Sequence, residues 1–127
     1  MRFRWIALAS LVALTACGST AERRNFSVYF QPYSAELDQQ ALESAVNAAQ
    51  YAQAHASLPV LVAGYSAPAD PGRDVDGLSD QRADAIKRVL TDDGVSANRI
   101  TIDANGATDP LSMPQVAVRR VDITVGR

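Results

Sequence analysis

Four segments of the chain carry the hydrophobic patterns of β-strands. In the first, Phe26, Val28 and Phe30 alternate with Ser27 and Tyr29, which predicts a strand that is buried on one face. The second is a continuous apolar run, typical of a central strand that is buried on both faces. In the last, apolar and polar residues alternate again. The predicted strands cover residues 26–30, 60–64, 100–102 and 119–125.

Two longer segments have the period of amphipathic helices. Over residues 34–56, small apolar residues recur at steps of three and four, so one face of this helix can pack closely against a neighbour. Ser34 has the position of its N-cap, and Asp38 in the first turns suits the helix dipole. The second helix begins with Ser79 as its predicted N-cap. Its apolar face is formed by Ala83, Ile86 and Leu90.

The predicted elements follow one another in the order β-α-β-α-β-β, and 127 residues suit a single domain. Helices that connect strands indicate one sheet with the helices packed on one side of it. We therefore expect an α/β fold, an α+β sandwich, formed by residues 26–127.

The N-terminal segment has the features of an export signal. Two arginines precede an apolar run from Trp5 to Leu14, which is too short for a transmembrane helix, since a bilayer needs about 20 residues. The run ends in Leu14-Thr15-Ala16-Cys17, which resembles the lipobox of bacterial lipoproteins. The resemblance implies that Cys17 carries acyl chains such as palmitate. The alternative is an ordinary secretory signal with a cysteine nearby by chance.

This resemblance divides the N-terminal region into two parts. We expect residues 1–16 to be a lipoprotein signal peptide, and residues 17–25 to be the lipidated cysteine and a short tether. Gly18, rather than aspartate, follows the cysteine, and by resemblance this favours the outer membrane. The predicted location is therefore the periplasmic face of the outer membrane, with the lipid as the membrane anchor.

Composition restricts the chemistry of the domain. One cysteine excludes an intramolecular disulfide and a multi-cysteine metal site, and a single histidine leaves little for a hydrolytic site. The chain has 12 basic and 14 acidic residues, so its charge does not indicate nucleic-acid binding. We expect no enzyme activity, no metal, no cofactor and no nucleic-acid partner.

Several short motifs are spread along the predicted domain. They are Phe30-x-x-x-Ser34-Ala35-x-Leu37, Leu78-Ser79-x-x-Arg82-Ala83, Gly94-Val95, Arg99-Ile100 and Arg119-Arg120-Val121-Asp122-Ile123. In order and spacing they resemble the OmpA-like peptidoglycan-binding domain of peptidoglycan-associated lipoproteins and of outer-membrane porin-like proteins. The resemblance covers residues 26–125. It implies a mixed four-stranded sheet with the helices on one face.

The resemblance also implies a ligand, the diaminopimelate of the peptidoglycan stem peptide. Such a zwitterion needs a guanidinium for its carboxylate and an acid for its ammonium. Arg82 lies on the family's arginine and is the expected carboxylate ligand; the alternative is a surface arginine paired with Asp76 or another loop carboxylate. Arg119 is expected at the end of the sheet near this site. Tyr65 has the position of the family's histidine, and would either stack on a ligand or cover the sheet.

The chain differs from the family pattern at the acidic residue that binds the ammonium group. Ala67 replaces the aspartate that binds the ammonium, and Val75 and Val118 replace two asparagines. Loss of a charged partner costs roughly 1.5–3 kcal/mol, so binding should be tenfold to over a hundredfold weaker unless another acid substitutes. The candidate substitutes in the same loop are Asp70, Asp74 and Asp76. The alternative for these three residues is a solvated acidic loop.

The sequence leaves two functions open. In the first, an outer-membrane lipoprotein binds peptidoglycan non-covalently through Arg82 and so ties the membrane to the cell wall. In the second, a diverged domain has lost this ligand and acts as a protein-interaction module in a cell-envelope complex. The missing acid and the short tether favour the second function.

Overall fold

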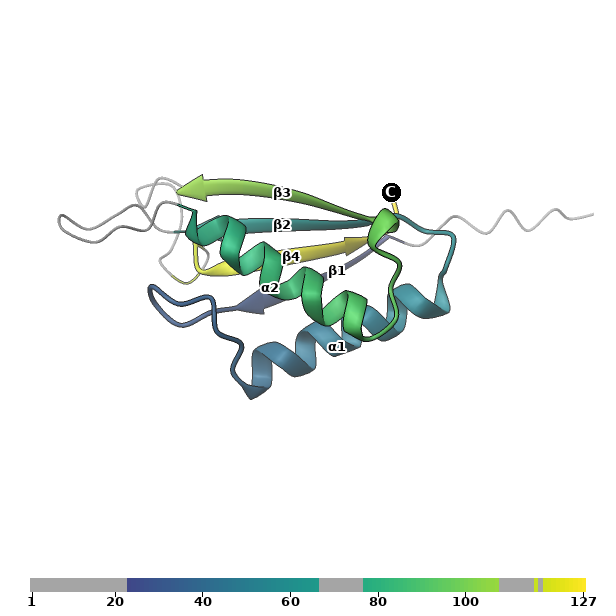
Figure 1. Ribbon diagram of the computed structural model, residues 1–127, viewed down its shortest axis with the longest axis horizontal. Coiled ribbons are helices and arrows are strands. Elements are labelled where there is room, and N and C mark those ends of the chain that lie inside the picture. The colour runs from purple at the N-terminus through teal and green to yellow at the C-terminus, as the bar shows by residue number, and fades with distance from the viewer. Residues whose placement is uncertain (1–22, 67–76, 108–115, 117) are drawn as a thin grey trace, which may run out of the picture.

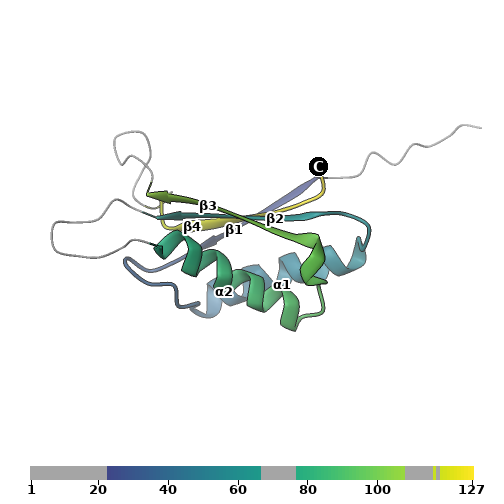
Figure 2. The same ribbon diagram turned by 45° about the horizontal axis from the view of Figure 1, so that its top comes forward.

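The computed structural model describes residues 23–66, 77–107, 116 and 118–127. Two helices lie against one face of a four-stranded sheet, and no helix among these residues covers the other face (Figures 1 and 2). None of the helices in these ranges is long and apolar enough to cross a membrane. In chain order the elements are β1 (Arg24–Tyr29), α1 (Gln39–Ala54), β2 (Val60–Ser66), α2 (Leu78–Asp92), a short 3-10 helix η1 (Ala97–Arg99), β3 (Ile100–Ala107) and β4 (Arg120–Val125).

The sheet is mixed, and its strand order is β1-β4-β2-β3. The last strand, β4, lies between β1 and β2 and is antiparallel to both, with Ile123 opposite Phe26 on one side and Val62 on the other. The pair of β2 and β3 is parallel, and α2 belongs to the crossover that a parallel pair requires. This architecture confirms the predicted mixed four-stranded sheet with helices on one face.

The core lies between the helices and the sheet. α1 contributes almost only alanines to it, and their small side chains allow the helix to approach the sheet closely. From the sheet, alternate residues of β4 point into the same core, as the pattern of the sequence predicts. The buried alanines of α1 are Ala41, Ala45, Ala48, Ala49 and Ala52.

The first turn of α2 packs directly on β2 at Gly64. A Cβ atom at this position would collide with the main-chain carbonyl oxygen of Ser79, and it would lie 3.2 Å from the Cβ atom of Ala83. Only glycine therefore allows this approach. The contact places Arg82, which follows in the same helix, at the end of the sheet where β2 ends and β4 begins.

The first helix begins later than the sequence predicts. α1 starts at Gln39 and its N-cap is Asp38 rather than Ser34, because Asp38 Oδ1 accepts a hydrogen bond of 2.8 Å from the main-chain N–H of Ala41. The Oγ atom of Ser34 instead accepts a hydrogen bond of 3.0 Å from the main-chain N–H of Glu36. The predicted helix of residues 34–56 was therefore too long at its start, and it also ends earlier, at Ala54.

The second helix also begins differently from the prediction. Gly77, in a left-handed conformation with φ of 82°, precedes α2, and Ser79 is buried within the first turn rather than acting as the N-cap. The close packing of the Ser79 main chain on Gly64 accounts for this burial. Three strands are longer than predicted, because pairing extends β1 back to Arg24, β2 onward to Ser66 and β3 onward to Ala107.

Candidate functional site

The guanidinium of Arg82 is buried, with 1% of the residue exposed, at the end of the sheet. Its Nε donates to the carbonyl oxygen of Ser34 at 2.8 Å, and its Nη2 donates to that of Gln31 at 3.2 Å. Its Nη1 donates to the carbonyl oxygens of Tyr65 at 3.0 Å and Val118 at 3.5 Å. The side chain therefore joins the segment before α1, the end of β2 and the start of β4. The alternative of a surface arginine is wrong for this residue.

Burial changes the electrostatics of Arg82. The pKa of Arg82 is lowered from 12.5 to about 10, mainly because burial removes the guanidinium from water and to a smaller extent because Arg119 carries a positive charge nearby. The group still carries its full charge at neutral pH. Its guanidinium carbon also lies 5.3 Å from the centre of the Phe30 ring, within the range of a cation–π contact.

Arg119 is the second cation of this end of the sheet. Its main-chain oxygen accepts a hydrogen bond of 2.8 Å from the N–H of Phe30, which holds the start of β4 against the end of β1. Its side chain is half-buried, and its Nε is buried without a hydrogen-bond partner. In the part of the chain that the structure describes, no carboxylate forms an ion pair with Arg82 or Arg119. Neither of the two neighbouring guanidiniums thus has an ion-pair partner among the described residues, which suits an anionic ligand.

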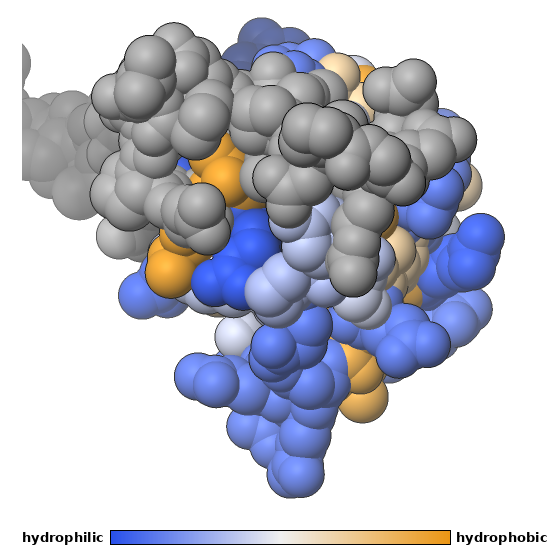
Figure 3. All heavy atoms as spheres, turned by 90° about the vertical axis from the view of Figure 1, so that its left-hand side faces the viewer, coloured by the Kyte–Doolittle hydropathy of each residue, from blue (hydrophilic) through white to orange (hydrophobic). Residues whose placement is uncertain are grey.

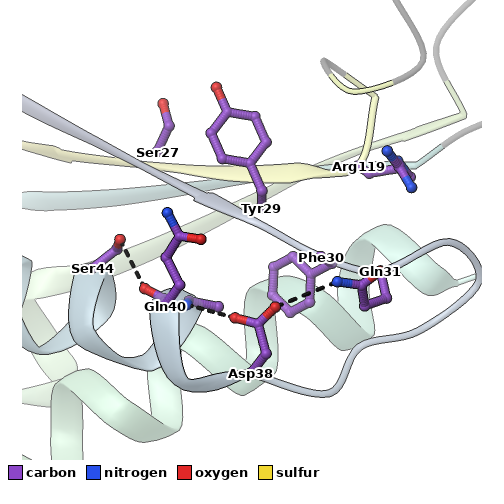
Figure 4. Close-up of a pocket in the computed structure, with 9 residues that line it drawn as sticks. Ser27, Tyr29, Phe30, Gln31, Asp38, Gln40, Ser44 and Arg119 are labelled. Carbon is purple, nitrogen blue, oxygen red and sulfur yellow. Dashed lines mark hydrogen bonds between the residues drawn. The ribbon is translucent and has the colours of Figure 1, made fainter.

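A pocket of about 310 Å³ adjoins Arg119 (Figure 4). Asp38, at the start of α1, lies across the pocket from Arg119, and the side-chain amide of Gln31 donates to Asp38 Oδ2 at 3.4 Å. The sequence identifies Asp38 only as an acid near a helix start, and no motif places Gln31 in a site. The residues that line the pocket are Ser27, Tyr29, Phe30, Gln31, Asp38, Gln40, Ala41, Ser44 and Arg119.

The surface at this end of the molecule is mainly hydrophilic where the structure describes it (Figure 3). Strongly hydrophilic atoms near the middle of this view lie beside hydrophobic ones.

Tyr65 and Arg120 lie on the sheet face that the helices do not cover. They help to line a second hollow of about 370 Å³ on that face, in which the guanidinium carbon of Arg120 lies 4.8 Å from the centre of the Tyr65 ring. Asp122 accepts a charged hydrogen bond of 2.8 Å from Arg120 Nε, which raises the pKa of Arg120. The Tyr65 ring therefore covers the sheet, as one of its two predicted alternatives states, and only its carbonyl oxygen contacts Arg82.

The structure thus brings Arg82 and Arg119 together, as predicted, and places the Tyr65 ring elsewhere. Four further predictions concern residues outside the described ranges: lipidation of Cys17, and ligand contacts of Asp70, Asp74 and Asp76. Ala67 and Val75, two of the departures from the family pattern, also lie outside these ranges. Val118 is described: it is fully buried, and its carbonyl oxygen is one of the acceptors of Arg82.

Solved OmpA-like domains share this fold. The OmpA-like domain of FopA1 from Francisella tularensis subsp. tularensis SCHU S4 superposes with a TM-score of 0.69 and 20% sequence identity, over 81% of this chain and 71% of that one. The peptidoglycan-associated lipoprotein from Burkholderia pseudomallei superposes with a TM-score of 0.63 and 24% identity, over 79% and 89% of the two chains.

Similarity of sequence points in the same direction. Outer membrane protein 40 of Porphyromonas gingivalis is 36% identical over 86 residues, which are 66% of this chain. The chain spans only 22% of the length of that relative. Residues 29–123 match the OmpA family, and this match confirms the predictions of the fold and of a protein that is not an enzyme. The chain therefore belongs to the OmpA family.

Proposed function

We propose that this domain binds peptidoglycan non-covalently and that Arg82 and Arg119 receive a carboxylate of the stem peptide. Membership of the OmpA family supports the proposal, as does the similar fold of a peptidoglycan-associated lipoprotein. The observation that carries it is the pair of neighbouring guanidiniums without a described carboxylate partner. A carboxylate in the pocket beside Arg119 would offset the mutual repulsion of the two guanidiniums.

The two arginines have different roles in this proposal. Arg82 donates to four main-chain carbonyl oxygens, which use most of its N–H groups, so it holds the surrounding segments and contributes mainly charge. The described part of the chain offers no such set of acceptors to Arg119, which lines the open pocket. Arg119 is therefore the residue whose replacement should reduce binding without dismantling the site.

Co-sedimentation with purified cell-wall sacculi tests the proposal. The full chain in mild detergent should sediment with sacculi, and Arg119→Gln should weaken its binding about tenfold. Arg88, exposed on α2, gives a matched control, because Arg88→Gln removes the same charge outside the site. Absence of sedimentation by the wild type would refute peptidoglycan binding and leave the protein-interaction module as the function. Equal binding by the two variants would refute the role of Arg119.

We also propose that Cys17 is acylated and anchors the protein at the periplasmic face of the outer membrane. The sequence Leu14-Thr15-Ala16-Cys17, with Gly18 after it, supports this. Multiple acyl chains on one residue give the stable anchoring that a single chain does not. Mass spectrometry should find the acyl chains on the wild type and an unprocessed, unacylated precursor for Cys17→Ser. A processed Cys17→Ser chain would contradict the anchor.

A further inference from the structure

The pocket beside Arg119 contains two opposite charges that do not pair with each other. Arg119 reaches it from the start of β4 and Asp38 from the start of α1 (Figure 4). Among the described residues Arg120 and Asp122 form an ion pair, with 2.8 Å between Nε and Oδ2, whereas Arg119 and Asp38 do not form one. The pocket thus offers a separate cation and anion to whatever enters it.

The carboxylate of Asp38 keeps capacity for a ligand. Its Oδ1 accepts the capping hydrogen bond of 2.8 Å from the Ala41 N–H, which turns this oxygen toward the helix. Among the described residues, its Oδ2 accepts one long hydrogen bond, of 3.4 Å, from the amide of Gln31. A carboxylate oxygen accepts more than one hydrogen bond, so Oδ2 is available for a stronger donor such as an ammonium group.

The size of the pocket limits what this pair of charges can hold. A volume of about 310 Å³ is at the lower end for small-molecule sites and suits a group of amino-acid size. The hydroxyl of Ser44 and the amide of Gln40 add neutral polar groups to its wall. A small zwitterion, with an ammonium and a carboxylate a few bonds apart, matches both the volume and the two charges.

We propose that Asp38 binds the ammonium group of a zwitterionic amino-acid centre whose carboxylate binds Arg119. This assignment rests on the proposed function, and it places the acid of the site on α1 rather than in the loop that follows β2. Asp38 is also the N-cap of α1, so its removal by alanine would disturb the helix as well as the ligand. Asparagine caps a helix about as well as aspartate, and Asp38→Asn therefore removes the charge while it keeps the cap.

A double-mutant cycle in which one change is made on the protein and the other on the ligand measures the contact between Asp38 and the ammonium group. The probes are a soluble diaminopimelate-containing muropeptide with a free amine and the same muropeptide N-acetylated at that amine. Titration calorimetry should show that the wild type prefers the free amine by about tenfold and that Asp38→Asn has no preference. Glu43→Gln is the matched control, because Glu43 is exposed on the same helix and outside the pocket. This variant should keep the full preference.

The outcomes separate the two proposals. Binding of both muropeptides by the wild type, with the same amine preference in Asp38→Asn, would overturn the role of Asp38 and leave the proposed function standing. Absence of muropeptide binding by the wild type would overturn both. Loss of the preference in Glu43→Gln as well as in Asp38→Asn would show a general effect of negative charge rather than a contact, and would also overturn the assignment. Equal thermal midpoints for the wild type and Asp38→Asn are expected, since the cap is kept.

Discussion

Arg82→Met removes a charge from the interior of the domain together with the donors of four hydrogen bonds. The methionine side chain keeps much of the apolar stem of arginine, so it limits the loss of packing. The acceptors that lose their donor are the carbonyl oxygens of Gln31, Ser34, Tyr65 and Val118. The substitution therefore tests whether Arg82 holds these segments together in addition to any role in ligand binding.

The expected change in the free energy of unfolding follows from two opposing effects. Hydrogen bonds from a charged donor contribute about 1.5 kcal/mol each at the lower end of their range, so four of them amount to about 6 kcal/mol. Burial of the charge has the opposite effect: the lowering of the pKa from 12.5 to about 10 corresponds to about 3 kcal/mol against the charged form. We therefore expect Arg82→Met to lower the free energy of unfolding by about 3 kcal/mol.

Urea denaturation without ligand measures this change, provided that the slope of the transition stays the same. Arg88→Met on the exposed side of α2 is the control and should change the free energy of unfolding by less than about 0.5 kcal/mol. If Arg82→Met unfolds at the same urea concentration as the wild type, these carbonyl groups do not depend on the guanidinium and the expected loss of stability is wrong. An equal loss in the control would refute it too.

Three other perturbations test separate parts of the structure. Gly64→Ala should lower the free energy of unfolding by about 1–3 kcal/mol in urea, because the new methyl group meets the carbonyl oxygen of Ser79; a neutral result would contradict the close packing of α2 on β2. Arg99→Met should lower the free energy of unfolding by about 2 kcal/mol in the same assay, since Arg99 donates to three main-chain carbonyl groups at and after the end of α1. An unchanged urea midpoint would exclude this role. Binding of the N-acetylated muropeptide should be constant around neutral pH and should fall only as the pH rises through about 10, because burial lowers the pKa of Arg82 to that value and its neutral form attracts no anion; a decrease centred near neutral pH would contradict this assignment.

Local patterns were sufficient to predict the elements and their class. The alternation in β4 reports which face is buried, because side chains alternate across a strand whatever it pairs with. The apolar run of β2 predicted burial on both faces, and this was wrong for one face, because Leu61 is exposed where no described helix covers the sheet. The alanine stripe of α1 likewise predicts a close helix contact. The start of α1 could not be predicted in this way. Ser34 and Asp38 are both good N-caps, and the competition between them depends on the turn that the segment adopts.

The site depended on contacts between distant parts of the chain. The motif around Arg82 identified the residue, but its acceptors Gln31, Val118 and Tyr65 lie 51, 36 and 17 positions away. The hydrophobic periodicity of the sequence does not indicate whether such an arginine is exposed or buried. The same holds for Asp38 and Arg119, which face one pocket because β4 pairs with β1.

The order of strands and helices, the buried face of each and the family are thus already present in the sequence, since period and motif depend on neighbours a few positions apart. The insertion of β4 between β1 and β2, the burial of Arg82 and the meeting of Asp38 with Arg119 arise only when the sheet assembles. Their physical reason is that hydrogen bonding between strands joins residues far apart in the chain, and only this pairing determines which charges share a cavity and which remain in water.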